Sequence, residues 1–381
     1  MPEVLRTVRL EEAEQFERFL ERCYGFWPGF FSSAHPDRAE RTDDNCRCYL
    51  VLERDGRIVS HVGTFPMDIV VGPARVRCGG VGAVATLPEE RGRGYMSRLM
   101  EESVRRMRDD GMTLSVLWGD QQRYEIFGYE TCGMLYRVRV TRRSLEREHV
   151  SPVAVRELDP GSDEAPEVLA PLHARLPYRV ERPKLALQLK RRDARVFVTD
   201  EPGRETDGYL ITDRSWGGNM VIKEIYSRSG REAALIPSML DITRASSAEV
   251  ELGPGESEKL ERLLAVSCYW GAHPQGMFRI VDWGGLLRDL RPVLEVQCVG
   301  LPPFRLAVGC HWAEEVEWAT VEWDGAEMGV EPGWEAADGV EMGLRELTAA
   351  VLGGPHPHRT QLGLLGRALP VPLHIPSLDH V

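Results

Sequence analysis

The sequence predicts a mixed α/β protein built from more than one domain. The first observation is the length of 381 residues, which is more than one hydrophobic core usually accommodates. The second is the order of patterns in the first third of the chain, where a helix and alternating strands lead into a strand, a glycine turn, a helix and a strand. The third is a similar strand–helix–strand–helix succession between residues 220 and 264. We therefore expect two related units, followed by a third unit of helices and strands.

The composition indicates a globular protein without membrane spans. Charged residues make up 28% of the chain, the mean hydropathy is -0.29, and no apolar run approaches the length of a transmembrane helix. The first residues lack a basic segment followed by an apolar one, so we expect no signal peptide. The net charge of -12 argues against a nucleic-acid partner. The eight cysteines lack the spacing of a zinc site, so we predict reduced thiols, no metal and a cytoplasmic protein.

The first unit begins with an amphipathic helix predicted over Leu10–Cys23. Residues 25–45 show no regular period and hold several aromatic side chains, which either line a substrate cleft or pack on the domain. Alternating apolar residues then predict two antiparallel hairpins, with turns at Asp55-Gly56 and Gly72-Pro73. The expected hairpin strands are Cys48–Glu53, Ile58–Phe65, Met67–Val71 and Ala74–Cys78.

The centre of the first unit is a strand, a glycine turn, a helix and a second strand. The strands are predicted at Val81–Thr86 and Thr113–Leu117, and the helix between them is expected to end at Gly111. The turn reads Arg91-Gly92-Arg93-Gly94. Its glycines let backbone N–H groups face an anion, the start of a helix is electropositive, and the arginines add charged donors. This combination predicts a phosphate-binding turn.

Two classes of phosphate ligand fit such a turn. Gly92-x-Gly94-x-x-Ser97 is one residue short of the dinucleotide fingerprint, and Asp120 follows the second strand, where a ribose-binding acid could stand. That fingerprint normally follows the first strand of its domain, whereas a helix and several strands precede this turn. Two arginines also suit a ligand with more phosphate than a dinucleotide carries. We therefore rank a nucleotide-dependent oxidoreductase below the two candidate functions that are described next.

The turn resembles the R/Q-x-x-G-x-G/A loop of the GCN5-related N-acetyltransferases (GNAT), which holds the pyrophosphate of acetyl-CoA. Met96 stands where most of that family has Gly or Ala, a departure typical of the Eis-like (enhanced intracellular survival) branch. The same branch has a Tyr-x-x-Phe-Gly-Tyr segment after the next strand, which resembles residues 124–129 of this chain. The motifs cover roughly residues 45–135, and the similarity in length and layout extends over the whole chain.

The resemblance implies tandem GNAT-fold domains followed by a C-terminal α+β domain similar to a sterol carrier protein. It gives an acetyl-CoA-binding domain at residues 1–145, a degenerate second GNAT-like domain at 146–276 and the sterol-carrier-like domain at 277–381. A strand at Leu135–Val140 is expected to close the first domain, and residues 152–166 to form a linker. The second unit lacks an Arg-Gly turn before its helix, so we expect it to bind no CoA.

Hydrophobic periodicity predicts the remaining elements. In the second unit these are helices at Pro166–Arg175, Pro183–Arg192, Glu232–Ala245 and Glu256–Leu264 and strands at Val196–Thr199, Gly208–Thr212, Met220–Tyr226 and Glu249–Leu252. The third unit is expected to start at Phe278–Trp283 and to hold strands at Val293–Val299, Phe304–Val308 and Glu315–Trp323 and a helix at Val340–Leu352.

The resemblance implies an acetyl-CoA-dependent N-acetyltransferase that acetylates a primary amine. Tyr124 is the expected general acid, because a phenol after the second strand can donate a proton to the leaving thiolate. Cys78–Thr86 contains no carboxylate that could act as the base. In this branch the C-terminal carboxylate of the chain reaches the active site, so the resemblance assigns the base to Val381, with Asp379 and His380 as alternatives. The expected acetyl-CoA-binding residues are Val84, Ala85, Thr86, Arg91, Gly92, Arg93, Gly94, Tyr95 and Met96.

The sequence constrains the amine that accepts the acetyl group and the oligomeric state of the protein less closely. Residues 314–341 are rich in Asp and Glu and contain neither Lys nor Arg, which either attracts a cationic substrate or simply keeps the protein soluble. The branch suggests an aminoglycoside- or polyamine-like amine and a homo-oligomer, a hexamer in its known members. A non-catalytic protein that binds CoA or another ligand through the same fold is the main alternative to the enzyme. Lipid binding by the third unit is a further alternative.

Overall fold

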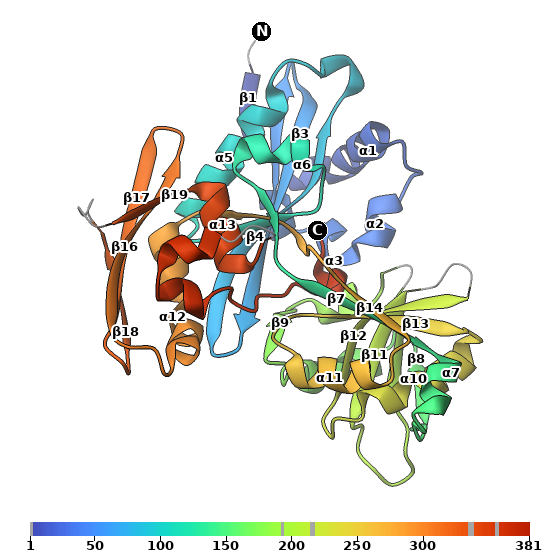
Figure 1. Cartoon of the computed structure of the whole chain (residues 1–381). Helices are drawn as coiled ribbons and strands as arrows, with labels where there is room; N and C mark the ends of the chain where they lie inside the picture. Colours follow the sequence, from blue (N-terminus) through green and yellow to red (C-terminus); the bar gives the residue numbers. More distant parts are fainter. Residues whose placement is uncertain (1–2, 192–193, 214–217, 334–338, 355–357) are drawn as a thin grey trace.

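The computed structural model describes residues 3–191, 194–213, 218–333, 339–354 and 358–381. Over these residues the strands form an eight-stranded, a seven-stranded and a four-stranded sheet, with helices packed on them (Figure 1). The mixed α/β class predicted from the sequence is confirmed. No helix in the described ranges combines the length and the apolar character that crossing a bilayer requires.

The first sheet has the strand order β1-β2-β3-β4-β5-β15-β6, with β9 paired to β3. Helix α1 (Ala13–Tyr24) contacts β4, and helix α5 (Tyr95–Asp109), which buries Leu99, Met100 and Met107, contacts β2, β3 and β4. The strands of this sheet are β1 (Glu3–Thr7), β2 (Tyr49–Arg54), β3 (Arg57–Val71), β4 (Ala74–Thr86), β5 (Leu114–Leu117), β6 (Glu130–Cys132), β9 (Tyr178–Val180) and β15 (Gly276–Ile280).

Strands β3 and β4 are longer than the sequence pattern predicted. Each was expected as two short strands, but β3 runs for 15 residues and β4 for 13. The pattern breaks at Pro66 and at Gly79-Gly80, but Pro66 pairs with Gly79 within an unbroken ladder. A separate bulge shifts the register of the two strands between His61 and Gly63. Opposite this shift Ala83 has a φ of 52°, and its carbonyl lies 2.8 Å from Nδ1 of the buried His61. The bulge bends β4 where the candidate site begins.

Strands β7 and β15 are exchanged between the first and second sheets, and β9 of the expected second unit also pairs with β3 of the first sheet. Strand β7 (Leu135–Thr141) was expected to close the first domain, but it pairs with β13 and β14 of the second sheet. In return β15, expected to open the third unit, pairs with β5 and β6 of the first sheet. Alternation along a strand shows which face is buried but not which sheet it joins, so the sequence pattern could not reveal this exchange.

The second sheet has the order β14-β7-β13-β12-β11-β10-β8. Its parallel pair β12–β13 is connected by helix α10, just as β4 and β5 are connected by α5. The expected linker contains β8 instead, which pairs with the edge of β10 from Val155↔Thr199 to Leu158↔Val196. The remaining elements are α7 (Arg142–Arg147), β8 (Val155–Leu158), α8 (Glu164–His173), α9 (Leu185–Gln188), β10 (Ala194–Thr199), β11 (Gly208–Asp213), β12 (Asn219–Ser227), α10 (Glu232–Thr243), β13 (Ser247–Leu252), α11 (Ser257–Ala265) and β14 (Tyr269–His273).

The third unit combines a sheet of order β18-β17-β16-β19 with helices α12 and α13. The strand predicted at Val293–Val299 is wrong, because this segment belongs mostly to α12. Its β-branched residues favour a strand locally, but Leu290, Val293 and Leu294 share a helical face that is buried in the core. The elements are α12 (Trp283–Cys298), β16 (Phe304–Trp312), β17 (Glu315–Trp323), β18 (Met328–Pro332), β19 (Val340–Gly343) and α13 (Leu344–Leu352).

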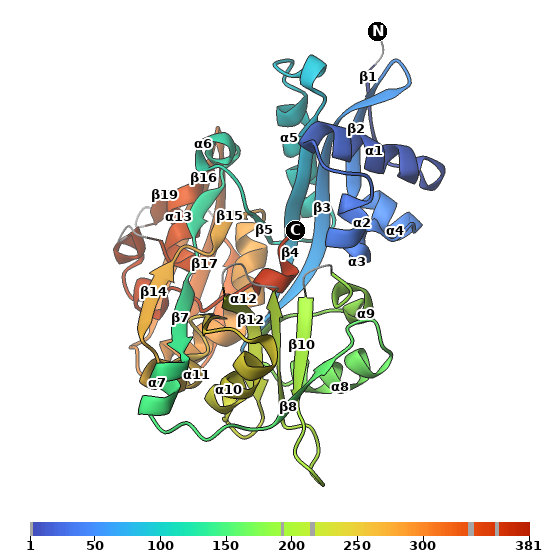
Figure 2. The ribbon, with the colours of Figure 1, turned by 90° about the vertical axis from the view of Figure 1, so that its right-hand side faces the viewer.

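The end of the chain returns to the first sheet. After α13 the described residues include the short 3₁₀ segments η4 (His358–Leu362), η5 (Leu365–Ala368) and η6 (Ser377–Asp379). Figure 2 shows the C-terminus beside β4. This arrangement brings the last residues of the chain to the central strand of the first unit.

Candidate active site

The site begins where strands β4 and β5 diverge. Their parallel pairing runs from Cys78↔Leu114 to Val81↔Leu117 and stops there. On its other edge β4 stays paired with β3 as far as Ser60↔Thr86. Residues 82–86 of β4 therefore have an edge with no strand partner in the described chain. Such an edge offers backbone donors and acceptors to an extended ligand.

The glycine turn lies at one end of this edge. Gly92 and Gly94 have φ values of 77° and 76°, which residues with a Cβ rarely adopt, and Gly94 is the N-cap of α5. Arg91 and Arg93 are exposed beside the helix start; Arg91 Nε lies 3.4 Å from the Thr86 carbonyl oxygen. The turn, the end of β4 and the start of α5 enclose a cavity of about 490 Å³. All the acetyl-CoA-binding residues expected from the sequence line this cavity.

Within this set the side chain of Tyr95 does not face the cavity. It is buried, and its hydroxyl donates to Glu3 Oε1 at 3.1 Å. Only the backbone of Tyr95 can therefore serve a ligand at the helix start. Met96 is partly buried and packs against the core of the first unit.

The cavity also has lining residues that the sequence did not predict, among them Tyr24, Arg123 and Glu90, whose carboxylate lies 3.2 Å from Arg93 Nε. Arg123, from the short helix α6 (Gln121–Tyr124), adds a third guanidinium to the lining. Tyr24, at the end of α1, donates its hydroxyl to the Val84 carbonyl at 2.7 Å. The position of Arg123 next to Tyr124 was a usable signal, whereas the bond from Tyr24 to a residue 60 positions away had no local signature.

A second cavity, of about 280 Å³, adjoins the first one and shares Tyr24 and Val84 with it. Many of its lining residues come from the aromatic segment that follows α1. This segment was expected to be irregular, but it folds into α2 (Phe30–Ala34), α3 (Pro36–Ala39) and α4 (Asp43–Arg47). Phe26, Phe30 and Phe31 of this segment line the cavity, and Phe31 also packs against the core of the first unit. The aromatic lining comprises Tyr24, Phe26, Phe30, Phe31, Tyr49, Phe65, Trp118 and Tyr124.

The C-terminal residue lies against β4 inside this second cavity. A Cβ on Gly82 would stand 2.9 Å from the carboxyl carbon of Val381, and a Cβ on Gly80 would stand 2.7 Å from Val381 Cγ1. The two glycines thus make room for the last residue of the chain. In this way the terminal carboxylate reaches a strand that has none of its own.

Buried polar contacts hold the tail in this position. Asp379 accepts hydrogen bonds from Arg182, and both side chains are almost fully buried. Arg38, which also lines the cavity, donates to the carbonyl oxygens of Asp379 and His380 at 3.2 and 3.1 Å. The ring of His380 stacks on Trp118 with 3.7 Å between the ring centroids. Burial lowers the pKa of His380 to about 3, so this imidazole is neutral at neutral pH.

Tyr124 lines the same cavity as Val381. Its ring packs on Gly119, where a Cβ would lie 2.5 Å from Tyr124 Cε2, and meets Tyr129 edge-on. Burial raises the pKa of Tyr124, while the neighbouring Arg123 acts in the opposite direction. The phenol therefore keeps its proton at neutral pH. The structure thus brings together the two residues to which the sequence assigned proton transfer.

Comparison with known proteins agrees with this geometry. Residues 4–132 match the family of acetyltransferase (GNAT) domains. Over all of its residues the chain is similar to a GCN5-related N-acetyltransferase from Kribbella flavida, with a TM-score of 0.73, 19% identity and 98% of that chain covered. It is also similar to a conserved protein from Enterococcus faecalis described as a probable N-acyltransferase, with a TM-score of 0.77, 16% identity and full coverage of both chains.

Eis1 from Mycobacterium abscessus has the same fold as well, with a TM-score of 0.66, 16% identity, and 98% of this chain and 99% of that chain covered. No curated protein sequence matches the chain significantly. Residues 4–132 are therefore a GNAT acetyltransferase domain, and the protein is an acetyltransferase with the fold of the Eis-like branch.

Proposed function

We propose that the protein transfers the acetyl group of acetyl-CoA to a primary amine of a small cationic acceptor. One observation carries this proposal. The carboxyl group of Val381 and the phenol of Tyr124 line one cavity, and that cavity adjoins the cavity of the glycine turn. A donor held by the turn and the open edge of β4 would present its reactive end between a base and an acid.

The glycine turn suits the phosphates of CoA. Arg91, Arg93 and Arg123 supply positive charge, and the start of α5 supplies backbone N–H groups without helical partners. The free edge of residues 82–86 suits the amide groups of the pantetheine arm. Tyr24 already donates to the Val84 carbonyl, which retains a second lone pair for the donor.

We assign the role of the base to the Val381 carboxylate. The amine must lose a proton before its nitrogen can attack the thioester carbonyl. Asp379 is a poor candidate, because both of its oxygens accept hydrogen bonds from Arg182. His380 is poor as well, because an imidazole with a pKa of about 3 is a weak base. The terminal carboxylate is the remaining group of the tail.

Tyr124 completes the transfer as the general acid. The attack forms the C–N bond of the amide and breaks the C–S bond of the thioester, which leaves a thiolate. Tyr124 gives its proton to this sulfur, while the proton of the amine goes to Val381. The raised pKa of Tyr124 supports this role, because the phenol is protonated before the transfer.

The lining of the second cavity suits an amine with an apolar body. Aromatic faces attract a cation, and the Val381 carboxylate adds a negative charge. None of the cavity's lining residues comes from the described part of the acidic segment, residues 314–333 and 339–341. The cavity thus favours a single ammonium group among rings over a long polycation.

The test is an acetylation assay with acetyl-CoA and a panel of amines. We expect release of CoA thiol together with an N-acetyl product seen by mass spectrometry, and faster turnover for aryl-alkyl amines than for polyamines. Binding of CoA without product from any amine would favour a non-catalytic ligand-binding protein. A homo-oligomer and a sterol-carrier-like third unit are further expectations from the resemblance, and light scattering tests the first of them.

A further inference from the structure

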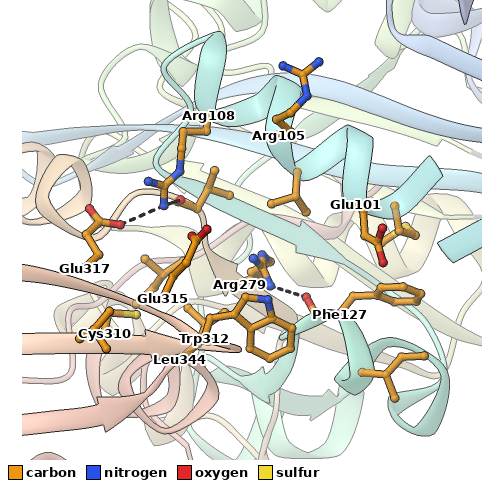
Figure 3. Close-up of a pocket in the computed structure, with 16 residues that line it drawn as sticks. Glu101, Arg105, Arg108, Phe127, Arg279, Cys310, Trp312, Glu315, Glu317 and Leu344 are labelled. Atoms are coloured by element: carbon orange, nitrogen blue, oxygen red, sulfur yellow. Dashed lines mark hydrogen bonds and ion pairs between the residues drawn. The ribbon is translucent and has the colours of Figure 1, made fainter. Parts of the chain in front are cut away.

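A larger cavity lies away from the glycine turn and from the C-terminus. It has a volume of about 790 Å³ and shares no lining residue with the two cavities of the candidate active site. It lies between α5, the segment 124–129 and the β16–β17 hairpin (Figure 3). Its apolar lining includes Met100, Val104, Ile126, Phe127, Val316 and Leu344.

Arg279 of β15 reaches this cavity as a buried and incompletely paired cation. The residue is 9% exposed, its Nη1 donates to the Phe127 carbonyl, and its guanidinium carbon lies 5.0 Å from the ring centroid of Trp312. Its Nε has no hydrogen-bond partner, and no carboxylate of the described residues forms an ion pair with it. A buried charge without a counter-ion is costly, so the cavity lacks one negative group.

The other charged side chains of the cavity do not supply the negative group that Arg279 lacks. Arg108 is paired with Glu317 at 2.9 Å, and Arg105 is paired with acids of its own helix. Glu101 and Glu315 also line the cavity, but both are exposed to solvent at its rim. The buried charge of the cavity floor is therefore positive, whereas the carboxylates of Glu101 and Glu315 lie in contact with solvent.

We propose that this cavity binds a small organic carboxylate with an apolar body. The carboxylate pairs with Arg279 at the floor, because a guanidinium presents its donors in a planar fork that matches a carboxylate. The apolar body of the ligand covers the side chains of α5 and the β16–β17 hairpin. The volume leaves room for a ligand of several carbon atoms beyond the carboxylate.

The guanidinium is held in place before any ligand arrives. The ring of Trp312 covers one face, and the Phe127 carbonyl fixes Nη1. Gly128 lies so close that a Cβ there would stand 2.2 Å from Nη1, a position with a φ of 80° that a residue with a side chain could hardly occupy. A group fixed in this way loses little conformational freedom on binding, which favours affinity.

The test is calorimetric titration of the full chain with octanoate, in the presence of saturating CoA. We expect octanoate to bind at one site, and 1-octanol and octylamine to bind at least about tenfold more weakly, as the loss of a charge-assisted pair requires. Arg279→Met should weaken octanoate binding by a similar factor. Arg305→Met, on an exposed arginine of β16 outside the cavity, is the matched control and should leave binding unchanged.

A second variant keeps the test decisive if Arg279→Met fails to fold. Val104→Trp fills the cavity from the half-buried face of α5 and leaves Arg279 intact. We expect it to abolish octanoate binding with an unchanged circular dichroism spectrum. Absence of octanoate binding to the wild-type protein, equal binding of octanoate and octanol, or undiminished binding by Val104→Trp would each overturn the proposal.

Discussion

Arg182 and Asp379 form a buried ion pair between residues 197 positions apart, with Nε–Oδ1 and Nη2–Oδ2 distances of 2.9 and 2.7 Å. The same guanidinium also donates to both carboxylate oxygens of Glu224, on β12 of the second sheet. The second unit thus anchors the tail two residues before the terminal carboxylate. We propose that the second unit contributes to catalysis by positioning Val381 rather than by binding CoA.

Asp379→Asn should separate this anchoring from folding. Arg182 keeps its contacts with Glu224, so the melting temperature should fall only moderately, whereas the tail loses its charged anchor. We expect kcat to fall at least about tenfold and the affinity for CoA to stay unchanged. Steady-state kinetics, calorimetry and thermal melting measure these three quantities. Glu157→Gln, which breaks the partly exposed pair with Arg195, is the control; an unchanged kcat in Asp379→Asn would remove the anchoring role.

The arginines of the glycine turn should govern the affinity for CoA. Replacing Arg91 and Arg93 together by Ala removes exposed charge that supports no buried packing. Hydrogen bonds to charged groups contribute about 1.5–3 kcal/mol each, so the Kd for CoA should rise at least about tenfold with no change in fold. Arg106→Ala, in the last turn of α5, should leave the Kd unchanged. If the double variant binds CoA as the wild type does, the assignment of the phosphate turn fails.

The second unit should bind no CoA. At the start of its helix α10 the carboxylate of Asp207 accepts hydrogen bonds from the hydroxyls of Ser227 and Ser229 at 2.7 and 2.6 Å. Asp207 also lies 3.6 Å from Arg231, so this helix start already has an internal anion. Calorimetry should therefore give one CoA per chain. A stoichiometry of two would show that this internal anion does not exclude CoA.

Tyr124→Phe should lower kcat by roughly 10²–10⁴ while CoA affinity and melting temperature change little. The variant keeps the ring that packs on Gly119 and removes only the proton donor. Tyr129→Phe is the matched control, because the Tyr129 hydroxyl lies 2.7 Å from Ser115 Oγ in the core and not in the cavity. Turnover like that of the wild type in Tyr124→Phe would mean that water protonates the thiolate.

The pH profile gives a separate check on Tyr124. An acid must be protonated to act, and burial raises the pKa of this phenol above its usual value of about 10. The group thus stays active as pH rises through the neutral range, and kcat should fall only above that usual value. A fall in kcat near pH 7 with rising pH, unchanged in Tyr124→Phe, would point to another acid.

The sequence predicted the parts of the site that depend on local patterns. The glycine turn, the helix start and the segment around Tyr124 each have a short signature, and the structure places them around adjoining cavities. It could not predict the strand exchange of β7 and β15, because strand alternation does not name a partner. Nor could it identify Arg182, whose role depends on a contact 197 positions away. The strand wrongly predicted within α12 also depends on distant contacts, because burial of that segment in the core overrides its local β propensity.

The most direct test of the account is the kcat of a protein whose terminal carboxylate has been displaced by a Gly-Gly extension. Val381→Ala is the matched control, because it keeps a carboxylate at the same place in the chain. We predict that the extension lowers kcat by roughly 10²-fold or more, with the largest loss at low pH where the amine is most protonated, while Kd for CoA stays unchanged. A kcat equal to that of the wild type in the extended protein would contradict the assignment of Val381 as the base.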